Sequence, residues 1–176
     1  WIEDDIYTGR SWFFGGPEGE DTPVGSQFTS VACSLLLGGL ALQESDPHAA
    51  GWRSLATDLL IRSMKETSED GSYFGGIGEA LPVYADAFLA AGMLAQSGDT
   101  RLMETSLLQN APWWLLDTTL PNQQAWLPLN FNSDISIPEN PLAQRIFLLA
   151  QAQKPDAVLN WYLHQVLGGP SPDIFG

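Results

Sequence analysis

The sequence predicts an all-α domain. Apolar residues recur at three- and four-residue intervals in successive segments, no segment alternates strictly as a β-strand does, and prolines and glycines stand where helices start and end. With 176 residues, 44% of them hydrophobic, the chain can bury one core. We therefore expect a single α-helical domain over residues 1–176, with an irregular segment at 1–24.

The first two predicted helices form a hairpin. One runs from Ser26 to Leu42, and its apolar residues cover almost every side, as in a buried helix. The other is expected to begin after Ser45 and Asp46, which would cap it, with Pro47 at its first position. The short connection between them predicts antiparallel neighbours.

A glycine-rich stretch, EDGSYFGGIGEALPVYADAF at 69–88, leads into a second predicted hairpin from Leu81 to about Asp117. Its first helix should end near Gly98, which suits the residue after a helix. Its second helix is expected in two parts, because Pro112 lacks a backbone donor.

The third hairpin follows a long loop at 119–139. The stretch from Thr119 to Pro141 has four prolines, four asparagines and no sustained period, but its large apolar residues indicate that it is ordered and packed. The helices of the third hairpin should begin near Pro141 and Pro155, and the second should end at the glycines 168–169.

Stacked helical hairpins form either a solenoid or an α/α toroid. The chain has no fixed-period repeat, and its long loops fall between hairpins, so we expect the toroid. Three hairpins make only a partial ring. Because the chain begins at Trp1 without a leader, we expect either a processed form or a piece of a longer protein.

Charge and composition exclude several partners. Seven Lys and Arg against 21 Asp and Glu give a net charge of −14, which disfavours nucleic acid and anionic membranes. The apolar run Val31–Leu42 is too short to span a bilayer, so no membrane insertion is expected. The single cysteine, Cys33, is expected to be a buried apolar residue. We expect no cofactor and no metal, although the oxygen-rich Asp4–Asp5 and Asn130–Asp134 segments could hold a hard cation.

Aromatic residues beside glycines or in long loops are candidate platforms for sugar rings. Those selected are Trp12, Tyr73, Phe74 and Trp126, with Asn130 in the same loop as Trp126 as a hydrogen-bonding residue. The alternative is that these rings close the ends of helix pairs.

Two kinds of glycan chemistry have candidate residues. Glu79 with Asp86 or Asp134 could act as the carboxylate pair of a glycoside hydrolase. Tyr84 could instead act as base and acid in β-elimination from a uronic acid, if an amide or a cation offsets the substrate carboxylate.

Several segments together resemble a known family. The stretch from GSQFTSVACSLLLGGLAL through EDGSYFGGIG to GMLAQSGD, and the later LDTTLPNQQAWLPLNFNSD, resemble the α/α-toroid domain of heparinase II/III-like and alginate-type polysaccharide lyases. The resemblance covers about Gly25 to Gln153. Ser26-Gln27 stands where these lyases commonly have Asn-His, and Tyr84 is the tyrosine nearest the expected position, which Glu79 and its neighbours occupy.

The resemblance implies a carbohydrate-active protein that acts on a uronic-acid-containing polysaccharide or oligosaccharide outside the cytoplasm, secreted or periplasmic. It implies Tyr84 as base and acid, Gln27 at the substrate carboxylate and Glu79 beside them. Two alternatives stay open. One is an α/α-toroid glycoside hydrolase, and the other is a non-catalytic helical scaffold that binds a partner protein, such as a subunit completing the toroid.

Overall fold

The computed structural model describes residues 26–73, 75–127, 136–137 and 140–169. Within these ranges it contains six helices and two isolated β-bridges, and the all-α prediction is confirmed. The helices are α2 (Ser26–Ala41), α3 (Ala49–Thr67), α4 (Ile77–Gln96), α5 (Ser106–Asp117), α6 (Pro141–Gln153) and α7 (Ala157–Gln165).

The helices α2 and α3 form the predicted hairpin, and a glycine lets them approach closely. A Cβ at Gly39 would lie 2.8 Å from the carbonyl oxygen of Ala49 and 3.0 Å from the amide of Arg53. The start of α3 differs from the prediction. The Asp46 carboxylate accepts a hydrogen bond from the His48 amide at 2.8 Å, which holds a turn before the helix, so α3 begins at Ala49.

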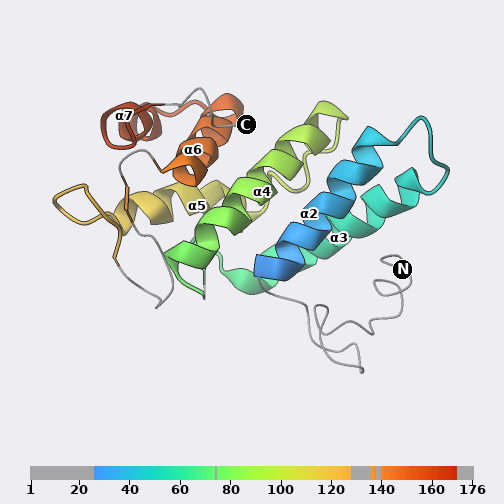
Figure 1. Cartoon of the computed structure of the whole chain (residues 1–176), viewed down its shortest axis with the longest axis horizontal. Coiled ribbons are helices and arrows are strands. Elements are labelled where there is room, and N and C mark those ends of the chain that lie inside the picture. Colours follow the sequence, from blue (N-terminus) through green and yellow to red (C-terminus); the bar gives the residue numbers. More distant parts are fainter. Residues whose placement is uncertain (1–25, 74, 128–135, 138–139, 170–176) are drawn as a thin grey trace.

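The central helix is α4, which lies between α2 and α6 (Figure 1). It begins at Ile77, four residues before the predicted start, and continues through Pro82. Of the helices in the described residues, only α4 is long and apolar enough to cross a membrane. In this fold 61% of its apolar window is buried among the other helices, as in the central helix of a helical bundle.

The second hairpin departs from the prediction at α5. This helix is continuous through the buried Pro112, and the break in the chain lies earlier, between Ser97 and Thr105. Arg101 holds that connection: its guanidinium lies 2.8 Å from an oxygen of Asp99 and 3.2 Å from an oxygen of Asp58 on α3.

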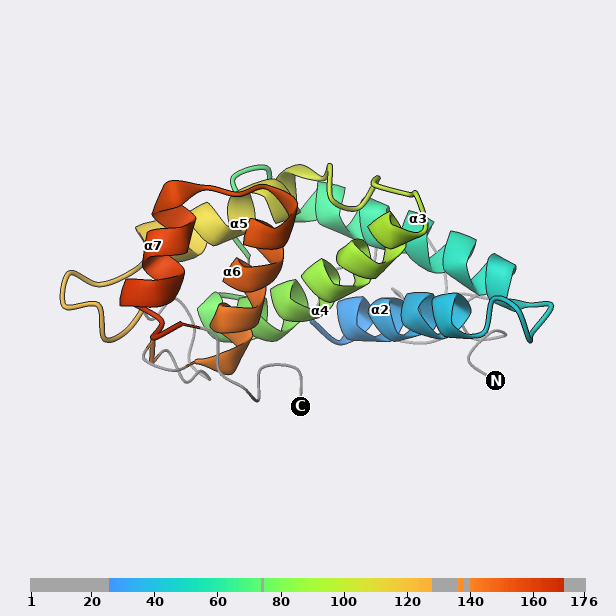
Figure 2. The ribbon, with the colours of Figure 1, turned by 90° about the horizontal axis from the view of Figure 1, so that it is seen from above.

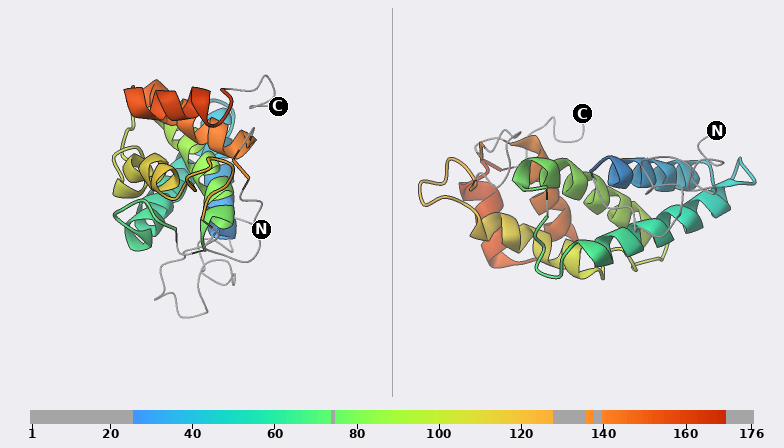
Figure 3. Two further views of the ribbon diagram at one scale, coloured as in Figure 1. Left: turned by 90° about the vertical axis from the view of Figure 1, so that its left-hand side faces the viewer. Right: turned by 90° about the horizontal axis from the view of Figure 1, so that it is seen from below.

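Successive helices alternate between two sets. The helices α2, α4 and α6 pack against one another in chain order, while α5 contacts both α3 and α7 (Figure 2). The molecule is elongated, with the α2–α3 hairpin at one end and α7 at the other (Figure 3). This alternation agrees with stacked hairpins, and closure into a toroid stays a prediction.

The long loop is anchored in the core at two described residues, while Leu127, one of its large apolar residues, is exposed. Trp126 and Ile137 are 0% exposed, and the Ile137 amide donates to the Gln124 carbonyl at 3.0 Å. The β-bridge between Thr119 and Trp126 closes the near side of the loop. Residues 128–135 and 138–139 lie outside the described ranges.

The third hairpin has well-defined caps. Asn140 accepts from the amide of Ala143 at the start of α6, and Asp156 accepts from the amides of Val158 and Leu159 at the start of α7. Between the helices, Gln151 and Asp156 exchange two hydrogen bonds: the Gln151 amide donates to the Asp156 carbonyl at 2.8 Å, and its oxygen accepts from the Asp156 N–H at 3.0 Å. This pair fixes the corner between α6 and α7.

Candidate functional site

The turn between α3 and α4 is bound to α5. Gly71 has a φ of +85°, and a Cβ at this position would overlap the backbone of Asn110. The side-chain amide of Asn110 donates to the carbonyl of Glu69 at 2.7 Å. The first glycine of the glycine-rich stretch is therefore required by its backbone conformation and by its close packing against α5.

Tyr84 lies at the centre of this arrangement. Its hydroxyl, in a side chain that is 0% exposed, donates to the carbonyl of Gly71 at 2.6 Å. Its ring meets Tyr73 edge-on with centroids 6.1 Å apart, and Trp114 edge-on at 6.2 Å. Burial raises the pKa of Tyr84, and the neighbouring Tyr73 and Asp70 raise it further.

A buried phenol with a raised pKa is a poor base at neutral pH, and a polymer cannot reach it in this conformation. The Tyr84 hydroxyl thus connects α4 to the α3–α4 turn. Its catalytic role stays a prediction, which this geometry does not favour.

Glu79 lies in the first turn of α4 and is half-buried. Its carboxylate packs directly against Gly75, where a Cβ would overlap it. The position is favourable for an anion, because the amino end of a helix carries partial positive charge. The pKa of Tyr73 is raised, first by burial and then by the charge of Glu79.

The proposed hydrolase pair stays a prediction, and the backbone spacing on α4 does not favour it. Glu79 and Asp86 stand seven residues apart on α4, which separates them by about 10.5 Å along the helix axis. Retaining enzymes need about 5–5.5 Å between the carboxyl groups and inverting enzymes about 6.5–9.5 Å. Asp86 instead accepts a hydrogen bond at 2.9 Å from Ser30 on α2, and Asp134 lies outside the described residues.

Two predicted stacking residues belong to the core. Tyr73 is 5% exposed and Trp126 is 0% exposed, so neither presents a face to a sugar ring. The indole N–H of Trp126 has no hydrogen bond of good geometry in the described residues, but it lies near the hydroxyl of Tyr162, which is 2.6 Å from the Thr119 hydroxyl. The side chains of Tyr73 and Trp126 are both part of the hydrophobic core.

The remaining predicted site residues are not placed by the structure. Gln27 lies in the first turn of α2, where only the backbone is described, and Trp12, Phe74 and Asn130 lie outside the described residues. Within the described part of the chain, no three or more His, Cys, Asp or Glu residues gather as metal ligands would.

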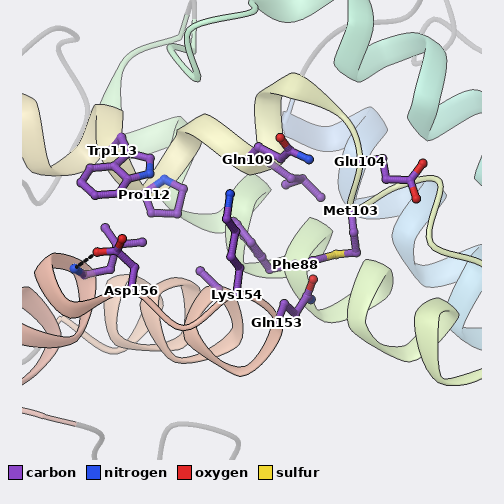
Figure 4. A pocket seen from close by; sticks show the side chains of 12 residues that line it. Phe88, Met103, Glu104, Gln109, Pro112, Trp113, Gln153, Lys154 and Asp156 are labelled. Carbon is purple, nitrogen blue, oxygen red and sulfur yellow. Dashed lines mark hydrogen bonds between the residues drawn. The ribbon is translucent and has the colours of Figure 1, made fainter.

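The structure has a cleft that the sequence did not indicate, with a volume of about 290 Å³, between α4, α5 and the α6–α7 corner (Figure 4). Its floor is apolar and is formed by Phe88, Leu108, Ala150 and Leu159. On the α5 side the rings of Pro112 and Trp113 lie next to each other.

The rim of this cleft is polar. It is formed by Glu104, Gln109, Gln153, Lys154 and Asp156. The Lys154 side chain extends from the α6–α7 corner across the cleft toward α5 (Figure 4). No signal in the sequence marks this site, because only the fold brings Trp113 and Lys154 to the same cleft.

Comparison with known proteins adds no assignment: the chain matches no protein-family model, no curated protein and no solved structure.

Proposed function

We propose that the chain forms part of an α/α toroid in a carbohydrate-active protein, and that its described helices act as scaffold rather than as a reaction centre. One observation carries the scaffold role. The hydroxyl of Tyr84, the best candidate for β-elimination, is buried and donates at 2.6 Å to the carbonyl of Gly71. Breaking that bond would leave a buried carbonyl unsatisfied, which costs about 1–3 kcal/mol.

The toroid is supported by the alternation of helices. In an α/α toroid, one helix of each hairpin faces the inside of the ring and the other faces outward. Here α4 packs between α2 and α6, and α5 contacts both α3 and α7. The carbohydrate role is supported by the resemblance between Gly25 and Gln153 and the lyase toroids.

The test is an assay of the whole chain on uronic-acid polysaccharides. We expect no rise in ultraviolet absorbance from the unsaturated product of β-elimination, and we expect Tyr84→Phe to change unfolding without changing the assay. Circular dichroism shows that the variant is folded. A steady rise in absorbance that Tyr84→Phe abolishes in a folded protein would overturn the scaffold role.

A parallel assay addresses hydrolysis. Reducing ends would be measured with neutral and acidic polysaccharides, for the chain and for Glu79→Gln. The scaffold role predicts no release in either case. Release that depends on Glu79 would show that the first turn of α4 is a reaction centre.

A further inference from the structure

We propose that the cleft between α4, α5 and the α6–α7 corner binds one neutral sugar ring, with Trp113 as its stacking platform. The cleft is a site distinct from the α3–α4 turn to which Tyr84 is hydrogen-bonded. This inference rests on the proposed carbohydrate role, but it does not depend on closure of a toroid.

The size and floor of the cleft fit a single ring. Its volume of about 290 Å³ lies just below the range of ligand pockets, which is about 300–1,000 Å³, as suits a ligand of one ring. Phe88 and Leu108 are each 2% exposed and form a fixed apolar base. A longer glycan would leave through the open side, with one unit held inside.

Trp113 has the position that a sugar platform needs. It packs partly against the core and also lines the cleft, next to Pro112 and across from the α6–α7 corner (Figure 4). The C–H groups of a pyranose ring pack well on an indole face, because the face is apolar and electron-rich. The sugar hydroxyls would then point to the rim.

The rim offers hydrogen bonds in both directions. The side-chain amides of Gln109 and Gln153 stand at the edge of the cleft, and each can donate two hydrogen bonds and accept others. Gln153 lies beside Gly92 on α4, where its amide nitrogen would be 3.7 Å from a Cβ. Lys154 adds a further donor, and it forms no ion pair with any described residue.

The charges of the rim favour a neutral ligand over an anionic one. Lys154 is its only cation, against the carboxylates of Glu104 and Asp156. Both carboxylates are already engaged, Glu104 with the Thr100 hydroxyl at 2.7 Å and Asp156 with the amides that start α7. The chain as a whole carries −14, which repels a polyanion further.

The experiment is an NMR titration of the whole chain with two series of oligosaccharides. One series contains neutral hexose disaccharides and trisaccharides, and the other contains uronate oligomers of the same length. We expect the neutral series to shift the Trp113 indole signal and the side-chain amides of Gln109 and Gln153. Trp113→Ala should weaken binding about two- to tenfold, the range for loss of one aromatic contact.

Two further variants make the result specific. Trp161→Ala removes a tryptophan that is 48% exposed on α7 and outside the cleft, so it should leave binding unchanged. Gln153→Ala changes an exposed rim residue without touching the floor, and it should also weaken binding. This variant keeps the proposal testable where Trp113→Ala is too unstable to measure.

The outcomes separate the two proposals. Neutral-sugar binding that Trp113→Ala weakens, and Trp161→Ala does not, supports the cleft. Binding of uronate oligomers alone, unaffected by Trp113→Ala, would overturn the cleft and leave the carbohydrate role standing. No shift with either series would overturn both.

Discussion

The hydroxyl of Tyr84 donates to the carbonyl of Gly71 at 2.6 Å and ties α4 to the turn that precedes it. Gly71 also lies against the backbone of Asn110 on α5. Its two contacts therefore join three parts of the chain: the α3–α4 turn, α4 and α5. Four predictions follow from this region and from the core beside it.

Tyr84→Phe should destabilise the fold by about 1–3 kcal/mol, because it removes the donor and leaves the buried Gly71 carbonyl without a partner. Urea unfolding monitored by circular dichroism measures the change. Ser34→Ala is the control, since Ser34 is exposed and surface substitutions usually cost under about 0.5 kcal/mol. Equal midpoints for the two variants would show that the hydrogen bond contributes nothing.

Gly71→Ala should destabilise the fold more than Gly98→Ala. Both glycines have positive φ, +85° and +91°, so both substitutions carry the backbone cost of about 1 kcal/mol. A Cβ at Gly98 meets nothing within 4 Å, whereas one at Gly71 overlaps Asn110. The difference between the two free energies of unfolding therefore measures the close approach alone.

Asp70 should remain largely ionised until the pH falls to about 2. Hydrogen bonds from Ser68 and Ser72 lower the pKa of Asp70 from 3.8 to about 2. Because the folded-state pKa is the lower one, the carboxylate contributes stability above pH 3.8, and this contribution disappears as the pH falls through about 2. The effect is small because Asp70 is exposed.

An NMR titration of the Asp70 side chain checks this value. Ser68→Ala should raise the pKa toward 3.8, and Asp70→Asn should flatten the dependence of unfolding on pH between 4 and 2. A midpoint near 3.8 in the unmodified chain would contradict the prediction.

The thiol of Cys33 should be unreactive in the folded protein. It is 2% exposed, and burial together with the charge of Asp86 raises its pKa, so little thiolate forms at neutral pH. A thiol reagent at pH 8 should label the chain only after denaturant is added. Rapid labelling without denaturant would show that α2 opens away from α4.

The sequence predicted the helices well because their signals are local. The amphipathic spacing and the proline at the start of α6 depend on residues a few positions apart. The failures were at helix boundaries and at one proline: α3 and α4 begin at Ala49 and Ile77 rather than at the predicted residues, and α5 continues through Pro112. Burial of α4 and α5 in the core stabilises those helices beyond their intrinsic propensity.

The site was harder to predict because burial depends on contacts between distant segments. Tyr73 and Trp126 are aromatic residues of the kind that form sugar platforms. Only the packing of α4 and of the loop after α5 shows that both side chains are buried in the core. Trp113 looked like an ordinary helical residue. Its place in the cleft becomes visible only with Lys154, which is 41 positions away in the sequence and lines the same cleft from the α6–α7 corner.

The two hydrogen bonds between Gln151 and Asp156 span only five positions in the chain. Contacts so close in sequence cost little loop entropy, and such elements form early when a protein folds. We therefore expect the α6–α7 corner to adopt its shape before α4 and α5 pack beside it. The α6–α7 side of the cleft would then serve as a template on which α4 and α5 assemble.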